Sequence, residues 1–137
     1  MTFFADTSIW YAAADRRDAS NARAKEILGS DEPVVTTDHV LLETWTLIAH
    51  RLSRAAAERF WEGMRSGVAR MECVGDADLE QAWSIGQGWA DQDFSLVDRT
   101  SFAVMLRLGL DRAASLDDHF AIFRYGPGRR RAFDVLR

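Results

Sequence analysis

Cysteine, proline and lysine are scarce in this chain, and it has no long apolar run. Because Cys73 is the only cysteine, neither an intrachain disulfide nor a zinc site built from cysteine ligands can form. We expect Cys73 to serve as a small buried hydrophobic side chain. The longest apolar runs fall far short of the roughly 20 residues that a membrane-spanning helix needs. The sequence therefore predicts no transmembrane helix.

Positive charge is also in short supply. The 17 Lys and Arg residues are outnumbered by 21 Asp and Glu residues, which gives a net charge of −4. This sign opposes binding of nucleic acid through overall electrostatics, so an RNA substrate requires a local source of positive charge. Lys25 is the only lysine, and the other 16 basic residues are arginines, which suit phosphate contacts but also ordinary ion pairs. Composition alone therefore names no ligand.

The length of 137 residues fits a single domain that spans 1–137. With 47% hydrophobic and 28% charged residues, the composition is that of an ordinary globular protein. The segment from Met1 to Asp6 has no basic leader, and an acid arrives before an apolar signal core can form. We therefore expect a cytoplasmic protein.

Short apolar segments alternate with longer amphipathic segments along the chain. The former predict strands, and the latter, which lie between capping residues and glycines, predict helices. Strands that alternate with helices indicate an α/β fold in which a parallel sheet is covered on both faces. Strands are expected at about 3–5, 34–36, 68–74, 112–116 and 133–136, and helices at about 9–14, 20–28, 40–48, 53–64, 76–88 and 95–108.

Asp6 directly follows the first predicted strand. Open parallel α/β sheets bind ligands at the carboxyl ends of their strands, so this position suits a functional carboxylate. It also suits a helix cap, because an aspartate side chain accepts hydrogen bonds from the free amides at a helix start. The local sequence favours the two interpretations about equally.

Glu43 lies within an apolar helical segment, with Val40 and Leu47 as neighbours on the same side. Its carboxylate is therefore expected to be partly buried. Because an unpaired buried charge is costly, Glu43 requires either a bound cation or an arginine partner.

Asp98 and Asp117 have simple structural explanations as well. Asp98 lies three residues after Ser95, which is the spacing of a capping box. Asp117 follows a short predicted strand and can cap a turn through His119 and Phe120. Taken alone, a cap is the better explanation of Asp98.

Other polar and aromatic residues give weaker signals. Asp93 in the polar loop is a reserve ligand, whereas Asp91 and Asp118 are less well placed. The three histidines lack the paired spacing of a zinc site and are expected on helix surfaces or in the core. They are His39, His50 and His119.

The arginine run 129–131, with Arg99 and Arg124, can guide RNA, but such a run is more often a solvated face. The five tryptophans are expected to pack in the core or at an interface rather than to stack on bases.

Four segments together resemble the PIN-domain ribonucleases, and most closely the VapC toxins of bacterial toxin–antitoxin pairs. They occur in the family's order and span nearly the whole chain, and the most specific are Ser-Leu-Val-Asp-x-x-Ser-Phe and Asp-x-His-Phe. The four are the apolar-Asp-Thr-Ser start at Asp6, the helical Glu43, the segment from Phe94 to Phe102 and Asp117-Asp118-His119-Phe120.

The resemblance implies a three-layer α/β/α sandwich around a central parallel sheet, with acids gathered at the carboxyl ends of the strands. It also implies Mg²⁺ as the cofactor, with Mn²⁺ as a substitute. The hydroxyls of Thr7 and Ser8 fit the polar residues beside the first acid. The family's catalytic and metal-ligating acids fall on Asp6, Glu43, Asp98 and Asp117.

The activity implied by the resemblance is that of a magnesium-dependent endoribonuclease toxin that cleaves RNA by metal-activated water. A bound metal lowers the pKa of water and polarises the phosphate, and hard cations prefer oxygen ligands. In this hypothesis Asp6 and Asp98 hold the principal metal, and Glu43 and Asp117 complete its shell. The family also implies a cognate antitoxin that covers the site, and a homodimer.

Two alternatives differ in class. A non-catalytic RNA-binding or regulatory module with a PIN-like fold predicts eroded acids, whereas all four acids are present. An aspartyl-phosphate enzyme with Asp6 as nucleophile requires a second acid two residues later and a catalytic lysine. Here position 8 is Ser8, and Lys25 is the only lysine.

Overall fold

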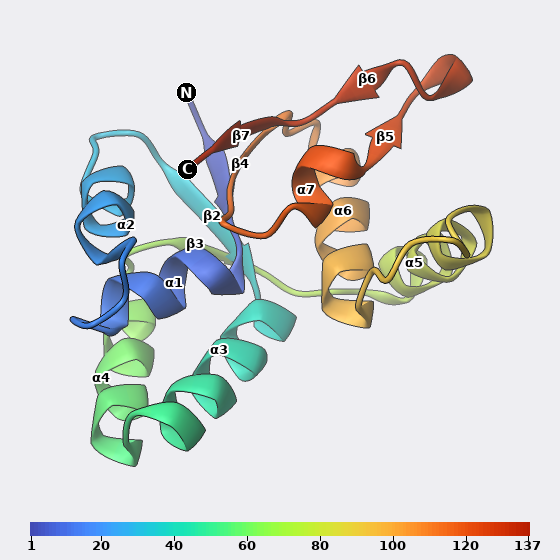
Figure 1. Ribbon diagram of the computed structural model, residues 1–137. Helices are drawn as coiled ribbons and strands as arrows, with labels where there is room; N and C mark the ends of the chain where they lie inside the picture. The colour runs from blue at the N-terminus through green and yellow to red at the C-terminus, as the bar shows by residue number, and fades with distance from the viewer.

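The computed structural model describes residues 1–137 and has a central five-stranded sheet in which all paired strands are parallel (Figure 1). The strand order is β3-β2-β1-β4-β7, so the first strand of the chain lies in the middle of the sheet. This confirms the predicted α/β fold with a parallel sheet. The strands are β1 (Phe3–Ala5), β2 (Val34–Thr37), β3 (Arg70–Glu72), β4 (Arg112–Ala114) and β7 (Asp134–Leu136).

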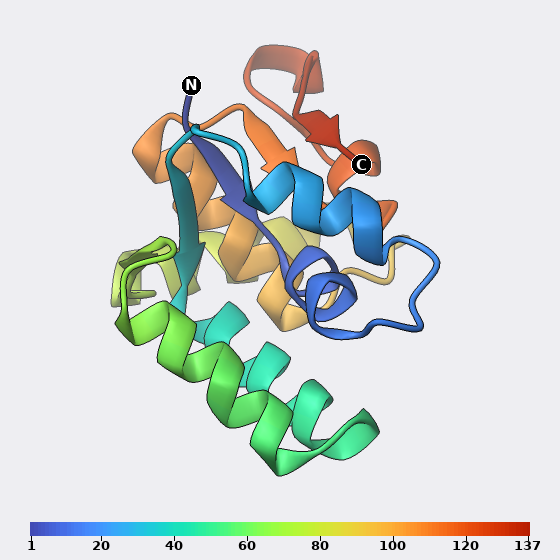
Figure 2. The same ribbon diagram turned by 90° about the vertical axis from the view of Figure 1, so that its left-hand side faces the viewer.

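Helices cover both faces of the sheet. In Figure 1, α1 and α2 lie on one side of the sheet and α5 and α6 lie on the other. Figure 2 shows α3 and α4 side by side as a helical hairpin that extends beyond the carboxyl ends of the strands. The main helices are α1 (Thr7–Ala14), α2 (Asn21–Leu28), α3 (Asp38–Arg51), α4 (Arg54–Arg65), α5 (Asp76–Gly88) and α6 (Leu96–Leu108).

Polar side chains fix the starts of the helices. Thr37 caps α3, because its Oγ1 accepts a hydrogen bond from the Val40 amide at 3.1 Å. Ser53 caps α4 by accepting from the Ala56 amide at 3.0 Å. These hydrogen bonds satisfy backbone donors that a helix start leaves without partners.

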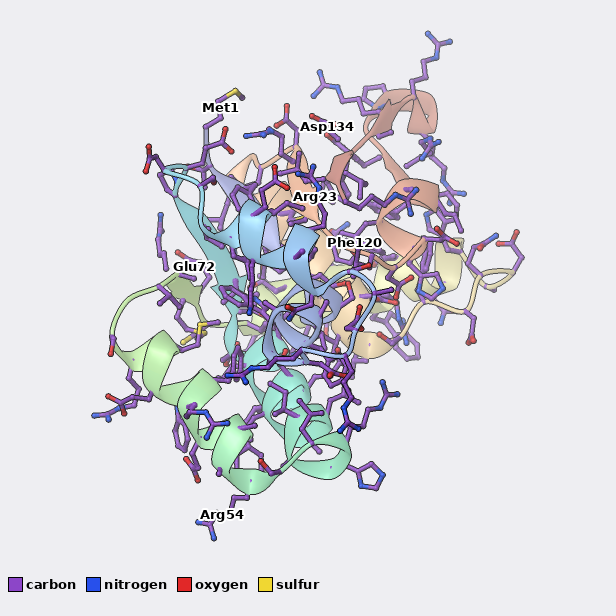
Figure 3. The ribbon with its side chains drawn as sticks, turned by 60° about the vertical axis from the view of Figure 1, so that its left-hand side comes forward. Met1, Arg23, Arg54, Glu72, Phe120 and Asp134 are labelled. Atoms are coloured by element: carbon purple, nitrogen blue, oxygen red, sulfur yellow. The ribbon has the colours of Figure 1, made fainter.

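Phenylalanine rings form the part of the core that supports the carboxyl edge of the sheet. Phe4 on β1 stacks on Phe120, with ring centroids 6.2 Å apart, and Phe102 on α6 stacks on Phe123 at 4.4 Å. Figure 3 shows Phe120 in the interior, whereas Arg54, the first residue of α4, lies at the periphery. Because packed rings resist displacement, α6 and the short helix α7 (His119–Ile122) are held firmly against the sheet.

Three features differ from the sequence-based expectations. Cys73 is exposed, so its predicted burial was wrong. The reason is that Cys73 follows β3, a short edge strand that ends at Glu72 and is itself only partly covered. The short helix α7 was not predicted. The sequence analysis also missed the C-terminal hairpin formed by β5 (Arg124–Tyr125), the 3-10 turn Pro127–Arg129 and β6 (Arg131–Ala132).

None of the helices combines the length and the apolar character required to span a bilayer.

Candidate active site

One pocket of about 410 Å³ lies at the carboxyl ends of β1 and β4. It opens between α1, α3 and the start of α6. The pocket is lined by all four acids singled out from the sequence, which reach it from four different parts of the chain. They are Asp6, Glu43, Asp98 and Asp117.

Asp6 is the most confined of the four, with 4% of its surface exposed. Its Oδ1 accepts from the Thr7 amide at 2.6 Å, which makes it the cap of α1. Its Oδ2 accepts from the hydroxyls of Ser115 at 2.8 Å and Ser8 at 3.0 Å. Burial, and secondarily the nearby charge of Asp98, raise the pKa of Asp6 to about 6, although these hydrogen bonds oppose the rise.

Asp98 is also buried, with 7% of its surface exposed. It forms the predicted capping box of α6. The Ser95 amide donates to its Oδ2 at 3.0 Å, and its own amide donates to the Ser95 hydroxyl at 3.0 Å. Its Oδ1 accepts no hydrogen bond from the protein. The cap therefore occupies one carboxylate oxygen and leaves the other without a hydrogen-bond donor.

Asp117 fixes the turn into α7. Its Oδ1 accepts from the His119 amide at 2.9 Å, as expected of a turn cap. The Ser115 hydroxyl in turn accepts from the Asp117 amide at 3.0 Å. Ser115 therefore contacts both Asp6 and Asp117 and couples the ends of two adjacent strands, β1 and β4.

His119 belongs to this cluster, so the expected surface or core role for it was wrong. Its Nδ1 lies 2.7 Å from Oδ2 of Asp98 and 3.3 Å from Oδ1 of Asp117. One possible ligand atom from each of these three residues falls within 4.8 Å of the others. Burial alone lowers the pKa of His119, but the hydrogen bond to Asp98 and the nearby negative charges outweigh it and raise the pKa.

Glu43 projects from α3 into the pocket and is half-buried, as predicted. It forms neither a hydrogen bond nor an ion pair, so the alternative of an arginine partner does not hold. By contrast, the buried Asp78 is satisfied by Arg107, whose Nε donates to it at 2.9 Å. An unpaired, half-buried carboxylate is costly unless a cation approaches it.

Arg51, at the end of α3, is the only arginine that lines the pocket. Its guanidinium lies over the ring of Tyr11, 5.4 Å from the centroid, and it forms no ion pair. Its place in the pocket was not predicted from the sequence. A cation on the wall of an acidic pocket can hold a phosphate group there.

The remaining candidates lie outside the pocket. Asp118 pairs with Arg137 at 2.8 Å. Asp93 does not line the pocket, although its charge contributes to the raised pKa of His119. His39 and His50 line a neighbouring groove on α3.

The donor set suits a hard cation. It consists of carboxylate oxygens from the four acids, two of them nearly buried, with one imidazole beside them and no thiolate. Closely placed carboxylates repel one another, and a divalent cation that binds oxygen ligands relieves this repulsion. Asp6, Asp98 and Asp117 act as helix or turn caps and at the same time line one acidic pocket together with Glu43. Asp98, Asp117 and His119 lie close enough to one another to hold a metal ion.

Comparisons with known proteins agree on one family. A family model described as the PIN domain matches residues 3–124. The chain is 42% identical over 120 residues to the 23S rRNA-specific endonuclease VapC20 of Mycobacterium tuberculosis, covering 86% of this chain and 91% of the relative. The crystal structure of VapC20, described as a Sarcin-Ricin loop cleaving toxin, is similar with a TM-score of 0.82 and 38% identity, over 87% of this chain and 92% of that chain.

Two further solved structures share the fold at low sequence identity. VapBC2 from Rickettsia felis, bound to a DNA fragment of its promoter, has a TM-score of 0.66 at 10% identity and covers 86% of this chain and 89% of that one. FitAcB from Neisseria gonorrhoeae has a TM-score of 0.63 at 16% identity, over 87% and 89%. At such identities the likeness concerns the fold alone.

Proposed function

Because the chain belongs to the PIN-domain family, we propose that it is a metal-dependent endoribonuclease and the toxin of a toxin–antitoxin pair. The observation that carries this proposal is the meeting of four carboxylates in one pocket, with Glu43 unpaired and one oxygen of Asp98 free. The 42% identity to a 23S rRNA-specific endonuclease supports ribosomal RNA as the substrate. The proposed location is the cytoplasm, where such a substrate is found.

The proposed cofactor is Mg²⁺, with Mn²⁺ as a substitute. Asp6 and Asp98 would hold it, with Glu43 and Asp117 completing or positioning its shell. When bound, the ion supplies a nucleophile of lowered pKa and neutralises charge that builds on the phosphate. This choice is supported by the ligands that the site offers, which are carboxylate oxygens without a thiolate. Mg²⁺ prefers oxygen ligands over softer donors.

The surrounding residues orient the carboxylates and the substrate. The hydroxyls of Ser8 and Ser115 fix Oδ2 of Asp6, which limits the rotation of that carboxylate. His119 holds Oδ2 of Asp98, so that Oδ1 remains directed to the pocket. Arg51 binds a non-bridging oxygen of the phosphate from the pocket wall, where it opposes the repulsion from the acids.

The proposed partners are the RNA substrate, a cognate antitoxin and a second copy of the chain. Among the similar structures, one is a VapBC pair bound to promoter DNA, which supports an antitoxin partner. A protein that inserts a cation among these acids would block them, because Glu43 and Oδ1 of Asp98 have no internal partners. The homodimer is expected from the family alone.

The decisive experiment is cleavage of purified ribosomes and of total RNA, with Mg²⁺ or with EDTA, followed by primer extension to map the cut. Wild-type protein should make a discrete cut that EDTA abolishes. Asp98→Asn should abolish the cut. Asp118→Asn is the matched control, because Asp118 lies outside the pocket and pairs with Arg137, and it should cleave normally.

Two results would contradict the proposal. Equal cleavage by wild type and Asp98→Asn would point to a contaminating nuclease. RNA binding without any cleavage would favour the non-catalytic module instead.

A further inference from the structure

The C-terminal hairpin carries positive charge that the fold does not neutralise. Four arginines of the hairpin, and Arg99 on the neighbouring helix α6, form no ion pair, whereas seven of the other 11 arginines do. The four are Arg124, Arg129, Arg130 and Arg131. We call these five residues the arginine surface. Figure 3 shows nitrogen-tipped side chains extending outward from the C-terminal part of the ribbon. In a chain with a net charge of −4, such a concentration of unpaired cations stands out.

The hairpin turn is fixed in place through Arg129. Its guanidinium lies 4.5 Å from the ring centroid of Trp89, and its Nη2 donates to the Gly88 carbonyl at 2.9 Å. Arg129 is also the only non-glycine residue with a positive φ, 53°. This conformation is unfavourable for a side chain with a Cβ, so the contacts to α5 must offset it. As a result, Arg130 and Arg131 are presented to solvent by a fixed turn.

Arg99 follows a pocket residue in the sequence and packs on the same helix as Arg129. It follows Asp98 directly on α6, and its guanidinium packs against Gly86 of α5, where a Cβ would collide with it. A Cβ at Gly88 would likewise lie 2.8 Å from Nη2 of Arg129. Both guanidinium groups therefore lie against the C-terminal half of α5. In Figure 1 the hairpin and α5 lie on the same side of the molecule, next to α6 and α7.

We propose that the arginine surface binds the phosphate backbone of the RNA whose cleavage we assign to the acidic pocket. The inference rests on the proposed function and names the surface that holds the substrate outside the pocket. Arg99, Arg124 and Arg129 each use part of their guanidinium to bind backbone carbonyls, which holds them in place. Arg130 and Arg131 are exposed and offer a full planar fork of donors that matches a phosphate group. The surface also supplies the local positive charge that the net charge of −4 requires for RNA binding.

The same region is poorly suited to a protein partner. Arginine anchors protein interfaces chiefly where it is buried in a well-packed pocket among aromatic and other apolar side chains. The hairpin segment 126–132 reads Gly-Pro-Gly-Arg-Arg-Arg-Ala and holds no large apolar side chain. The ring of Trp89 is already covered by Arg129. Asp91 and Asp93, in the loop after Trp89, form no ion pair with these arginines. The positive charge of the arginine surface therefore stays available.

The test compares two double variants that each remove two exposed, unpaired cations. Arg130→Gln/Arg131→Gln alters the arginine surface, and Lys25→Gln/Arg59→Gln is the matched control on α2 and α4. Binding of a short fluorescein-labelled RNA hairpin is measured by anisotropy in EDTA at several salt concentrations, so that metal-dependent cleavage does not consume the probe. Circular dichroism melting confirms that each variant folds.

The hairpin variant should bind RNA about five- to tenfold more weakly, and the slope of log K against log salt should fall by roughly 0.7 to 0.9 per arginine removed. The control should bind as wild type. Unchanged binding by the hairpin variant, or equal losses in both variants, would overturn the proposal. The proposal would also be overturned if the hairpin variant bound RNA normally but no longer bound fluorescein-labelled polyglutamate. That result would indicate an acidic protein partner.

The cleavage assay separates this proposal from the proposed function. If wild type cleaves RNA and the hairpin variant keeps its KM, the nuclease assignment stands and the arginine surface fails. If wild type does not cleave and the hairpin variant still loses RNA binding, the surface stands and the nuclease assignment fails.

Discussion

His119 holds one oxygen of Asp98, with its Nδ1 2.7 Å from Oδ2. The same oxygen accepts the Ser95 amide at 3.0 Å, so both contacts fall on one side of the carboxylate. The other oxygen has no protein partner, and Asp98 lines the pocket. The imidazole therefore orients Asp98 and offsets part of the negative charge around it.

The His119–Asp98 contact makes the stability of the fold depend on pH. The pKa of His119 is raised above its ordinary 6.5 by Asp98 and its neighbours despite burial. Its charged form therefore contributes stability that is fully present below about 6.5 and is lost as pH rises through the folded-state pKa. In His119→Gln this loss should be absent. The free energy of unfolding is measured by urea unfolding in EDTA at several pH values around neutrality. If it falls with rising pH as steeply in the variant as in wild type, His119 is not the source of the loss.

Asp6→Asn should stabilise the metal-free protein. In the unfolded chain Asp6 releases its proton near 3.8, whereas burial raises its pKa in the fold to about 6. Between these two pH values the folded protein binds more protons at Asp6 than the unfolded chain does. The free energy of unfolding therefore falls as pH rises from one value to the other, by about 3 kcal/mol in total. The variant lacks this loss and should unfold at a higher temperature at neutral pH in EDTA. A lower melting temperature there would show that its hydrogen bonds outweigh its charge.

Glu43→Gln and Asp78→Asn should have opposite effects. Glu43 has no partner, so Gln should leave stability in EDTA unchanged or higher while cleavage falls by about 100-fold or more. Asp78 pairs with Arg107 at 2.9 Å, so Asn should lower stability by roughly 1–3 kcal/mol and leave the rate of cleavage by folded protein intact. Chemical unfolding and initial rates measure both. Equal destabilisation by the two variants would contradict the reading of Glu43 as unpaired.

Divalent cation should raise stability only while the acids are intact. A ligand that binds the fold alone at 100 times its Kd adds about 2.7 kcal/mol to the free energy of unfolding. Titrating Mg²⁺ or Mn²⁺ during thermal melts should therefore raise the Tm of wild type and of Asp118→Asn. Asp98→Asn should show no such rise, and an equal rise in all three would mean that the cation binds elsewhere.

Arg51→Met should lower kcat/KM for RNA about 10- to 100-fold, because a charge-assisted phosphate contact contributes roughly 1.5–3 kcal/mol. Met keeps much of the apolar stem that lies near Tyr11. Arg59→Met, which removes an unpaired exposed arginine of α4, is the control and should retain full activity. Equal kcat/KM in the two variants would remove Arg51 from the substrate contacts.

The strand and helix pattern could be predicted because local rules agree with the fold. Asp6, Ser53 and Ser95 each mark a helix start that the structure contains. The choice between cap and pocket acid could not be made locally. A cap depends on one or two neighbouring amides, whereas the pocket depends on side chains far apart in sequence. The carboxylates of Asp6 and Asp98 each accept a capping hydrogen bond and also line the pocket.

His119 and Arg51 could not be assigned from spacing. His119 reaches Asp98 only because the short helix α7 turns its ring toward α6. Arg51 lines the pocket because α3 ends beside α1, where Tyr11 supports it. Both contacts depend on tertiary packing, which overrides local pattern. The short strands β5 and β6, of two residues each, lacked enough periodicity to be recognised.

The order of the strands has a consequence for synthesis on the ribosome. β1 precedes β2 and β4 along the chain but lies between them in the sheet. Asp6 therefore acquires its contact with Ser115, and the pocket acquires Asp117, only after β4 and the turn that follows it have been synthesised. A growing chain thus cannot assemble its four carboxylates until every segment from β1 to this turn has left the ribosome.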